Sequence, residues 1–196
     1  AITFTGTAGS TYSWTNDTAS IGLPASGTGN IASFTGVNAT GAAVVATISV
    51  VPSFGSCPGA AEVFTITVNP TPSVNAVASQ VVCNGAATGA VTFTGTGTSY
   101  TWTNDTASIG LAASGSGNIA SFAAVNATAS PVVATITVTP VFTGGIPCSG
   151  PTKVFTITVN PTPVVTDPSD QVVCNGASTG AVNFSGTGTS YDWTND

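Results

Sequence analysis

The chain has 196 residues, of which 42% are hydrophobic and only 4% are charged, with one basic residue, no His and a formal net charge of −6. Because basic residues are needed to neutralise phosphates, this composition excludes nucleic-acid binding through a basic surface. The lack of His removes the commonest general base, so an enzyme is not expected. Disorder is not expected either, because disordered chains combine low hydrophobicity with high charge.

The sequence repeats itself with a long period. Residues 14–23 return as residues 102–111, and a third copy starts at Trp193. The motif Asn-Pro-Thr-Pro at residues 69–72 recurs at residues 160–163, which lie 91 positions later. A unit of this length is too long for a solenoid turn and suits a self-sufficient β-sandwich of roughly 100 residues.

The Asn-Pro-Thr-Pro motifs are interpreted as short linkers, because Pro favours extended and stiff backbone. Residues 1–70 are then a repeat that lacks its first strand, residues 71–161 are a complete repeat, and residues 162–196 are the N-terminal part of a third. We expect the chain to be a piece of a longer one, since it starts without Met and ends inside a repeated motif.

Within the complete repeat, apolar residues alternate with Thr, which predicts strands rather than helices. The expected strands are residues 74–83, 90–95, 99–104, 118–125, 132–139 and 153–159, with a short one near Ile109. Gly and Ser clusters such as residues 114–117 are expected as the loops between them.

A Trp on the third strand is where immunoglobulin-type sandwiches place their central core residue. Tyr100 and Trp102 fall two apart and therefore point to the same face. We expect an all-β, Ig-like fold in tandem repeats, with Trp14, Trp102 and Trp193 in the core.

Several motifs together give the repeat a recognisable pattern. Val-Cys-Asn-Gly at residues 82–85 precedes a Thr-rich strand and Tyr-Thr-Trp-Thr at residues 100–103, and the last strand closes on Val-Asn-Pro-Thr-Pro at residues 159–163. This pattern resembles the tandem PKD-like (Ig-like) repeats of giant secreted cell-surface proteins of the Bacteroidota, over the whole chain. The Trp-Asp-Phe-Gly-Asp-Gly signature of PKD domains is not kept, because Thr103 follows Trp102.

The resemblance implies an extracellular location, export by type IX secretion, and a structural or adhesive role in gliding-associated adhesins or extracellular filaments. It also implies O-glycosylation at Thr18 and Thr106, since Asp-Thr-Ala at both places matches the motif that these bacteria modify. The alternative interpretation is an Asx-type turn after the strand, because Asn-Asp before Thr is ordinary turn chemistry. The two interpretations are compatible.

Two cysteines per repeat in an exported protein predict disulfides. Pairing within the repeat joins Cys83 to Cys148, although these loops lie at opposite poles of a regular sandwich and a disulfide needs a Cα separation of about 5.5 Å. The alternative pairs Cys57 with Cys83 and Cys148 with Cys174, across joints or between chains. Free thiols are the third option, and the spacing does not predict zinc.

No cofactor and no metal are expected. Asp167 and Asp170 suggest a Ca²⁺ site only weakly, because Ala76 and Ser79 stand at the equivalent positions of the preceding repeat. Aromatic residues that could form a sugar-binding platform, Phe93, Tyr100, Trp102 and Phe122, are expected in the core instead.

The sequence therefore predicts a structural repeat of a bacterial extracellular filament or adhesin stalk. Its expected partners are neighbouring repeats and copies of itself in a fibre, with neither nucleic acid nor membrane insertion. The alternative function is a glycan-binding adhesive module that acts by avidity on surface glycans.

Overall fold

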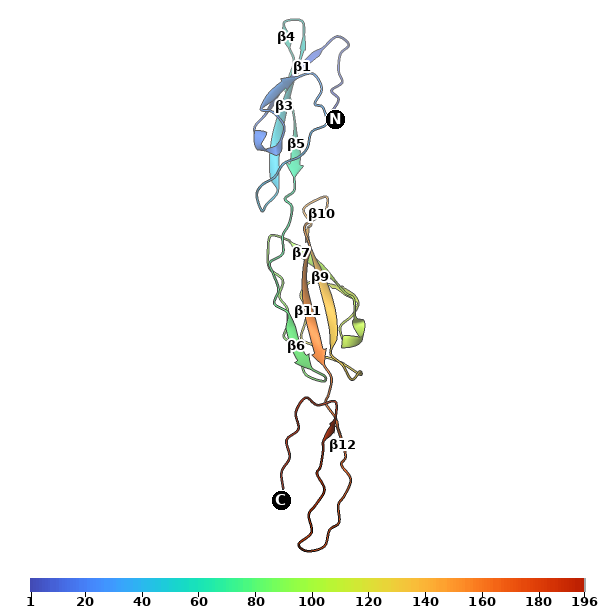
Figure 1. Cartoon of the computed structure of the whole chain (residues 1–196). Coiled ribbons are helices and arrows are strands. Elements are labelled where there is room, and N and C mark those ends of the chain that lie inside the picture. Colours follow the sequence, from blue (N-terminus) through green and yellow to red (C-terminus); the bar gives the residue numbers. More distant parts are fainter. Residues whose placement is uncertain (196) are drawn as a thin grey trace. The chain divides into compact units, whose positions relative to one another are not determined.

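The computed structural model describes residues 1–195 and is all-β, which confirms the all-β part of the predicted fold class. The first sheet has the order β2-β1-β3-β4, and β5 pairs with β3 as well (Figure 1). Its strands are β1 (Thr11–Asn16), β2 (Ser26–Thr28), β3 (Val44–Phe54), β4 (Cys57–Pro58) and β5 (Glu62–Val68).

The middle sheet has the order β6-β11-β9-β7-β8, with β10 paired to β9. Its strands are β6 (Gln80–Cys83), β7 (Ser99–Asn104), β8 (Ser114–Ser116), β9 (Val132–Phe142), β10 (Cys148–Ser149) and β11 (Lys153–Asn160). A third, two-stranded sheet pairs β12 (Val165–Thr166) with β13 (Ser185–Gly186). Two single-turn 3-10 helices, η1 (Ala19–Ile21) and η2 (Ala107–Ile109), complete the structure, and neither is long enough to cross a membrane.

The chain divides into two compact units. Unit 1 contains Ala1–Asn75, Phe93–Thr101 and Val138–Lys153, and unit 2 contains Ala76–Thr92, Trp102–Thr137 and Val154–Asp196. The division falls within the middle repeat, although the Pro-rich motif was the expected boundary.

Unit 1 has its core between the first sheet and an extended layer that faces it. Alternate residues of β3 are buried because one face of the strand points inward, as the period of two predicts. The facing layer is held by mutual backbone hydrogen bonds between Ile2 and Ile31, at 2.8 and 3.0 Å. The buried residues of this core are Trp14, Ile21, Leu23, Ile31, Ala46, Ile48 and Val50.

Unit 2 repeats this arrangement with equivalent residues. Its extended layer contains the bridges Ala87–Ala123 and Val91–Ile119. Its buried apolar residues are Val91, Trp102, Ile109, Leu111, Ile119, Ala124, Ala134, Ile136, Phe155, Ile157 and Val159. Both units thus bury alternate strand residues against an extended second layer, as in an all-β sandwich.

The predicted strand positions are right for β7 and close for β9 and β11. Only the end of the predicted strand 74–83 forms a strand, as β6, and the segments 90–95 and 118–125 pair only through isolated bridges. Ile109, near which a short strand was predicted, lies instead in η2, where its N–H donates to the Thr106 carbonyl at 3.3 Å.

Residues 114–117 were predicted as a loop, but three of them form β8. The strand forms because its central residue is a glycine that lies against the core tryptophan. The first copy shows this pairing in its strand register, where Trp14 lies directly opposite Gly27 in the β1–β2 pair. A Cβ on Gly27 would lie 2.2 Å from the indole Cζ2, and the same is true of Gly115 and Trp102. Small residues are needed here because the ring lies flat over the neighbouring strand.

Trp14 and Trp102 are buried, at 7% exposure each, whereas Trp193 is 71% exposed. The prediction of Trp193 as a core residue is therefore wrong for this chain. The described residues that follow Asn160 form only the β12–β13 pair, so no glycine strand covers the Trp193 ring.

We predict that Gly115→Ala destabilises the fold by about 1–3 kcal/mol, because the added methyl group must displace the Trp102 ring. Urea unfolding followed by tryptophan fluorescence measures the change. Ser116→Ala on the same strand is the control, since Ser116 is exposed. Equal stability of the two variants would contradict the proposed role of the glycine.

Candidate functional site at the joint and the Asp-Thr turn

The Asp-Thr turn follows the tryptophan strand in both repeats. In the second copy, buried Asn104 donates to the Leu111 carbonyl at 3.0 Å and accepts from the Thr106 N–H at 3.0 Å. Asp105 accepts from the Thr135 N–H at 2.7 Å and from the Thr106 hydroxyl at 2.9 Å, through Oδ1 in both cases. The predicted Asx-type turn is therefore present.

The first copy makes the same turn. Asp17 accepts from the Thr47 N–H and from the Thr18 hydroxyl, both at 2.8 Å. The Thr47 backbone N–H and then the Thr18 hydroxyl lower the pKa of Asp17 below its ordinary value, because both donate to its charged form. The Thr135 backbone N–H and then the Thr106 hydroxyl lower the pKa of Asp105 in the same way.

Thr18 and Thr106, the predicted O-glycosylation sites, are half-buried. Each hydroxyl is occupied as a donor to the neighbouring carboxylate, so attachment of a sugar would replace that hydrogen bond. The turn is fully formed without a sugar, and glycosylation stays a prediction.

All four cysteines are free thiols. Cys57 in β4 and Cys148 in β10 belong to unit 1, whereas Cys83 at the end of β6 and Cys174 belong to unit 2. Each predicted pair therefore has one cysteine in each unit, and the structure forms none of them. In particular it does not bring Cys83 and Cys148 together: Cys83 is paired opposite Asn160, and Cys148 opposite Phe142.

The first Asn-Pro-Thr-Pro motif is a packed joint. Pro70 and Pro72 are fully buried. The Asn69 amide donates to the carbonyls of Gly144 and Ile146, the second at 2.9 Å, and these residues precede β10. All of these groups belong to unit 1. The prediction of a stiff linker missed these side-chain contacts, which tie residues 75 or more positions apart.

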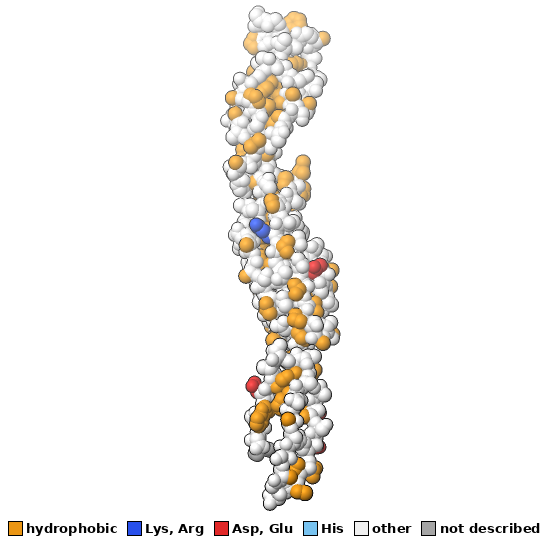
Figure 2. Space-filling view, viewed as in Figure 1, with side chains coloured by type: hydrophobic (Ala, Val, Ile, Leu, Met, Phe, Trp, Pro, Cys, Tyr) orange, Lys and Arg blue, Asp and Glu red, His pale blue; other side chains and the backbone are white. Residues whose placement is uncertain are grey.

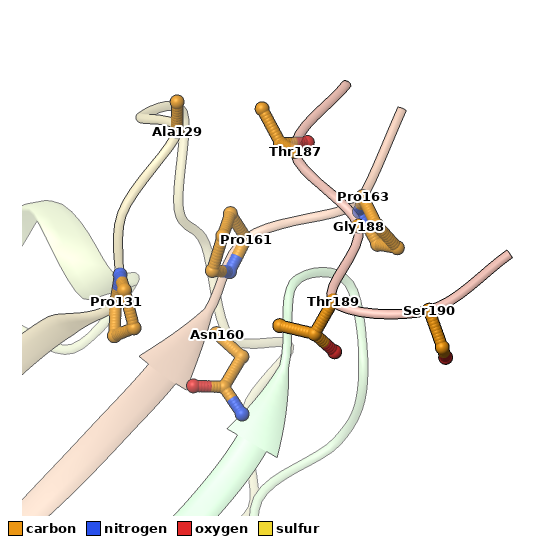
Figure 3. Close-up of a pocket in the computed structure, with 9 residues that line it drawn as sticks. All are labelled: Ala129, Pro131, Asn160, Pro161, Pro163, Thr187, Gly188, Thr189 and Ser190. Carbon is orange, nitrogen blue, oxygen red and sulfur yellow. The ribbon is translucent and has the colours of Figure 1, made fainter. Parts of the chain in front are cut away.

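The second Asn-Pro-Thr-Pro motif is open. Asn160 and Pro161 line a pocket of about 400 Å³ in unit 2, together with Ala129, Pro131, Pro163 and residues 187–190 (Figure 3). No hairpin equivalent to residues 144–146 covers it among the described residues. The first motif is therefore packed against the loop before β10, whereas the second borders an open pocket.

Charged side chains are sparse on the visible face of the molecule (Figure 2). Within residues 1–195, no three His, Cys, Asp or Glu residues come together. Of the four aromatic residues considered for a sugar platform, Phe93 and Trp102 are buried, and Tyr100 and Phe122 are half-buried. The rings of Phe93 and Trp102 therefore lie in the core, as expected, whereas those of Tyr100 and Phe122 are only partly covered.

Comparison with known proteins gives no relationship: no family model matches the chain, and no curated protein matches it.

We predict that the Asp17→Asn, Asp105→Asn double variant loses less stability in acid than the unchanged chain does. A folded pKa below the unfolded value means that each carboxylate stabilises the fold above about pH 3.9 and loses this effect as the pH falls further. Urea midpoints between pH 6 and pH 2 measure the difference. Parallel pH profiles of the two proteins would contradict it.

We predict that Asn69→Ala loosens the loop before β10, because two carbonyls lose their donor. Hydrogen exchange at residues 144–146 should accelerate several-fold. The matched control is Asn160→Ala, whose side chain lines the open pocket and should leave that loop unchanged. Unchanged exchange in Asn69→Ala would show that the amide does not hold the joint.

Proposed function

We propose that this chain is a structural repeat of a bacterial extracellular filament or adhesin stalk, which carries tension between a cell and its surroundings. The observation that carries the proposal is the parallel pairing of β6 with β11, the first and last strands of the middle sheet. Four residue pairs form this contact, from Gln80 with Ile157 to Cys83 with Asn160.

Parallel pairing of the first and last strands suits resistance to tension. A pull on the chain before β6 and after β11 acts on two parallel strands in opposite directions, so it shears them along their length. All the hydrogen bonds between the strands then resist together, whereas a hairpin pulled at one end opens one bond at a time. Burial of Phe155, Ile157 and Val159 beside this contact adds apolar packing to the same strand.

The packed joint supports the same function. Pro70 and Pro72 are buried, and Asn69 fixes the loop before β10, so bending at this point breaks contacts. The glycan-binding alternative gains no comparable support, because Phe93 and Trp102 lie in the core and present no platform to a sugar.

Single-molecule stretching of the chain from its two ends tests this proposal. Unfolding of the middle repeat should release on the order of 300 Å of chain, at up to about 3.6 Å per residue over 91 residues. Val82→Pro removes a backbone donor within β6 and should lower the unfolding force clearly.

The control for this experiment is Ala78→Pro, which lies before β6 and should leave the unfolding force close to that of the unchanged chain. Far-UV circular dichroism of both variants checks that the β structure is kept. Equal forces for Val82→Pro and the unchanged chain would refute the role of β6, and unfolding without measurable resistance would refute the mechanical function itself.

A further inference from the structure

The turn after β6 holds an Asn-Gly pair, Asn84 and Gly85, in a fixed position. β6 ends beside Asn160 of β11 (Figure 3), and the Asn84 N–H donates to the Asn160 carbonyl at 2.8 Å. The Gly85 N–H donates to the Ala124 carbonyl at 2.7 Å. Gly85 has a φ of +80°, and a Cβ there would meet nothing within 4 Å, so the backbone conformation rather than packing requires glycine.

The Asn84 side chain joins the end of β6 to two other segments of unit 2. Its Nδ2 donates to the Thr162 hydroxyl at 3.0 Å, in the linker that follows β11. Its Oδ1 accepts from the Asn126 N–H at 2.8 Å. The half-buried amide of Asn84 is therefore held through both its nitrogen and its oxygen.

Asn126 keeps this arrangement rigid. It is buried, and its amide makes four hydrogen bonds of its own. Nδ2 donates to the carbonyls of Ser130 and Val159, at 2.9 and 2.7 Å, and Oδ1 accepts from the N–H and the hydroxyl of Thr128, at 2.9 and 2.8 Å. Because Asn126 ties its own loop to the end of β11, its N–H is a fixed donor for Asn84.

An Asn that precedes Gly is chemically labile when the backbone can move. The Gly nitrogen attacks the carbon of the side-chain amide, and glycine lacks the Cβ that hinders this approach in other residues. In the closed turn, the Gly85 N–H is bonded to Ala124, and the Asn84 amide is held on both sides. The attack requires these bonds to break, so the closed turn protects the amide.

We propose that Asn84 is a deamidation site which the closed turn protects and which becomes reactive when β6 separates from β11. Water is the only co-reactant. Four residue pairs join the two strands, and the groups that hold Asn84 and Gly85 all lie outside β6 and its turn. Separation of β6 therefore removes every bond that protects the amide in one step.

The reaction is balanced without an oxidant or a reductant. The Gly85 nitrogen loses its proton and attacks the Asn84 Cγ, a C–N bond forms, and the Cγ–Nδ2 bond breaks. The leaving nitrogen takes up that proton and departs as ammonia, which leaves a five-membered imide. Water then opens the imide at one of its two carbonyls, and the product at position 84 is aspartate or isoaspartate.

Both products change the joint. Isoaspartate adds one carbon to the backbone between β6 and Gly85, so the β6–β11 register and the bond from Gly85 to Ala124 are no longer compatible. Aspartate replaces the donor with a charged acceptor, so the Thr162 hydroxyl must turn from accepting to donating. A repeat that has been pulled open keeps a chemical trace of it, a consequence that rests on the proposed mechanical function.

Mass spectrometry of chymotryptic fragments measures the conversion of Asn84. The fragments that contain Asn84 and Asn175 differ in sequence and are read separately. At mildly alkaline pH, Asn84 of the folded chain should be lost at least tenfold more slowly than in a synthetic peptide of residues 80–88. In urea above the unfolding midpoint, the chain and the peptide should react at the same rate.

Asn126→Ala tests whether the hydrogen-bonded network provides the protection. The loss of Asn84 in the folded chain should become several-fold faster, because the loop that fixes its amide loosens. Asn38→Ala is the matched control: Asn38 makes the equivalent bonds in unit 1, to the carbonyls of Ala42 and Val68 at 2.8 and 2.7 Å, and should leave the rate unchanged. Far-UV circular dichroism checks that both variants are folded.

Hydrogen exchange of the converted protein measures the effect on the joint. The chain is held in urea until Asn84 has reacted and is then returned to buffer. Exchange should be faster at Gly85 and Thr88, whose N–H groups donate to the Ala124 and Phe122 carbonyls in the closed turn. A chain held in urea only briefly is the control.

Three results would each overturn the proposal: equal rates in the folded chain and the peptide, equal rates in Asn126→Ala and Asn38→Ala, or unchanged exchange at Gly85 after conversion. These assays apply no force, so their failure leaves the proposed mechanical function standing. A lack of resistance in the stretching experiment would in turn leave the deamidation site standing.

Discussion

Coverage of the outer edge of the last strand determines how completely each repeat buries its core. In β11, the inward side chains of Phe155 and Ile157 are sealed because β6 lies alongside, and the strand's backbone groups are paired on both sides. In β5, the same alternating pattern leaves Phe64 and Ile66 half-buried. The β6–β11 contact therefore combines apolar burial and parallel strand pairing at one edge of the middle sheet.

The joint between repeats is held by Asn69 and by the buried prolines that follow it. Asn69 closes the last strand of one repeat and holds the loop before β10 of the next sequence repeat with its amide. The Asn69 Oδ1 atom is buried and lacks a hydrogen-bond partner among the described residues. A buried acceptor without a donor costs free energy, which offsets part of what the two hydrogen bonds of the Asn69 amide contribute.

Sequence reasoning identified the all-β fold and the strands with strict alternation, because burial of one sheet face imposes a period of two. It missed β8, since Ser114 and Ser116 flanking a glycine look like a loop, and only the Trp102 ring above Gly115 explains the strand. The Asx turn at Asn104 was predictable because its hydrogen bonds are local. The packing of Asn69 was not, because its partners lie 75 and 77 residues away and carry no motif. Trp193 was predicted as a core residue because its sequence neighbours match those of Trp14 and Trp102. It is exposed, because burial of the ring requires the strands that cover it in the other two copies.

Hydrogen exchange of the backbone amides in β11 tests the central claim most directly. The account predicts that these amides are strongly protected, that Val82→Pro makes the amides beside β6 exchange at least tenfold faster, and that Ala78→Pro leaves their exchange unchanged. Equal exchange in Val82→Pro and in the unchanged chain would contradict the account, because it would show that β6 does not protect the edge of β11.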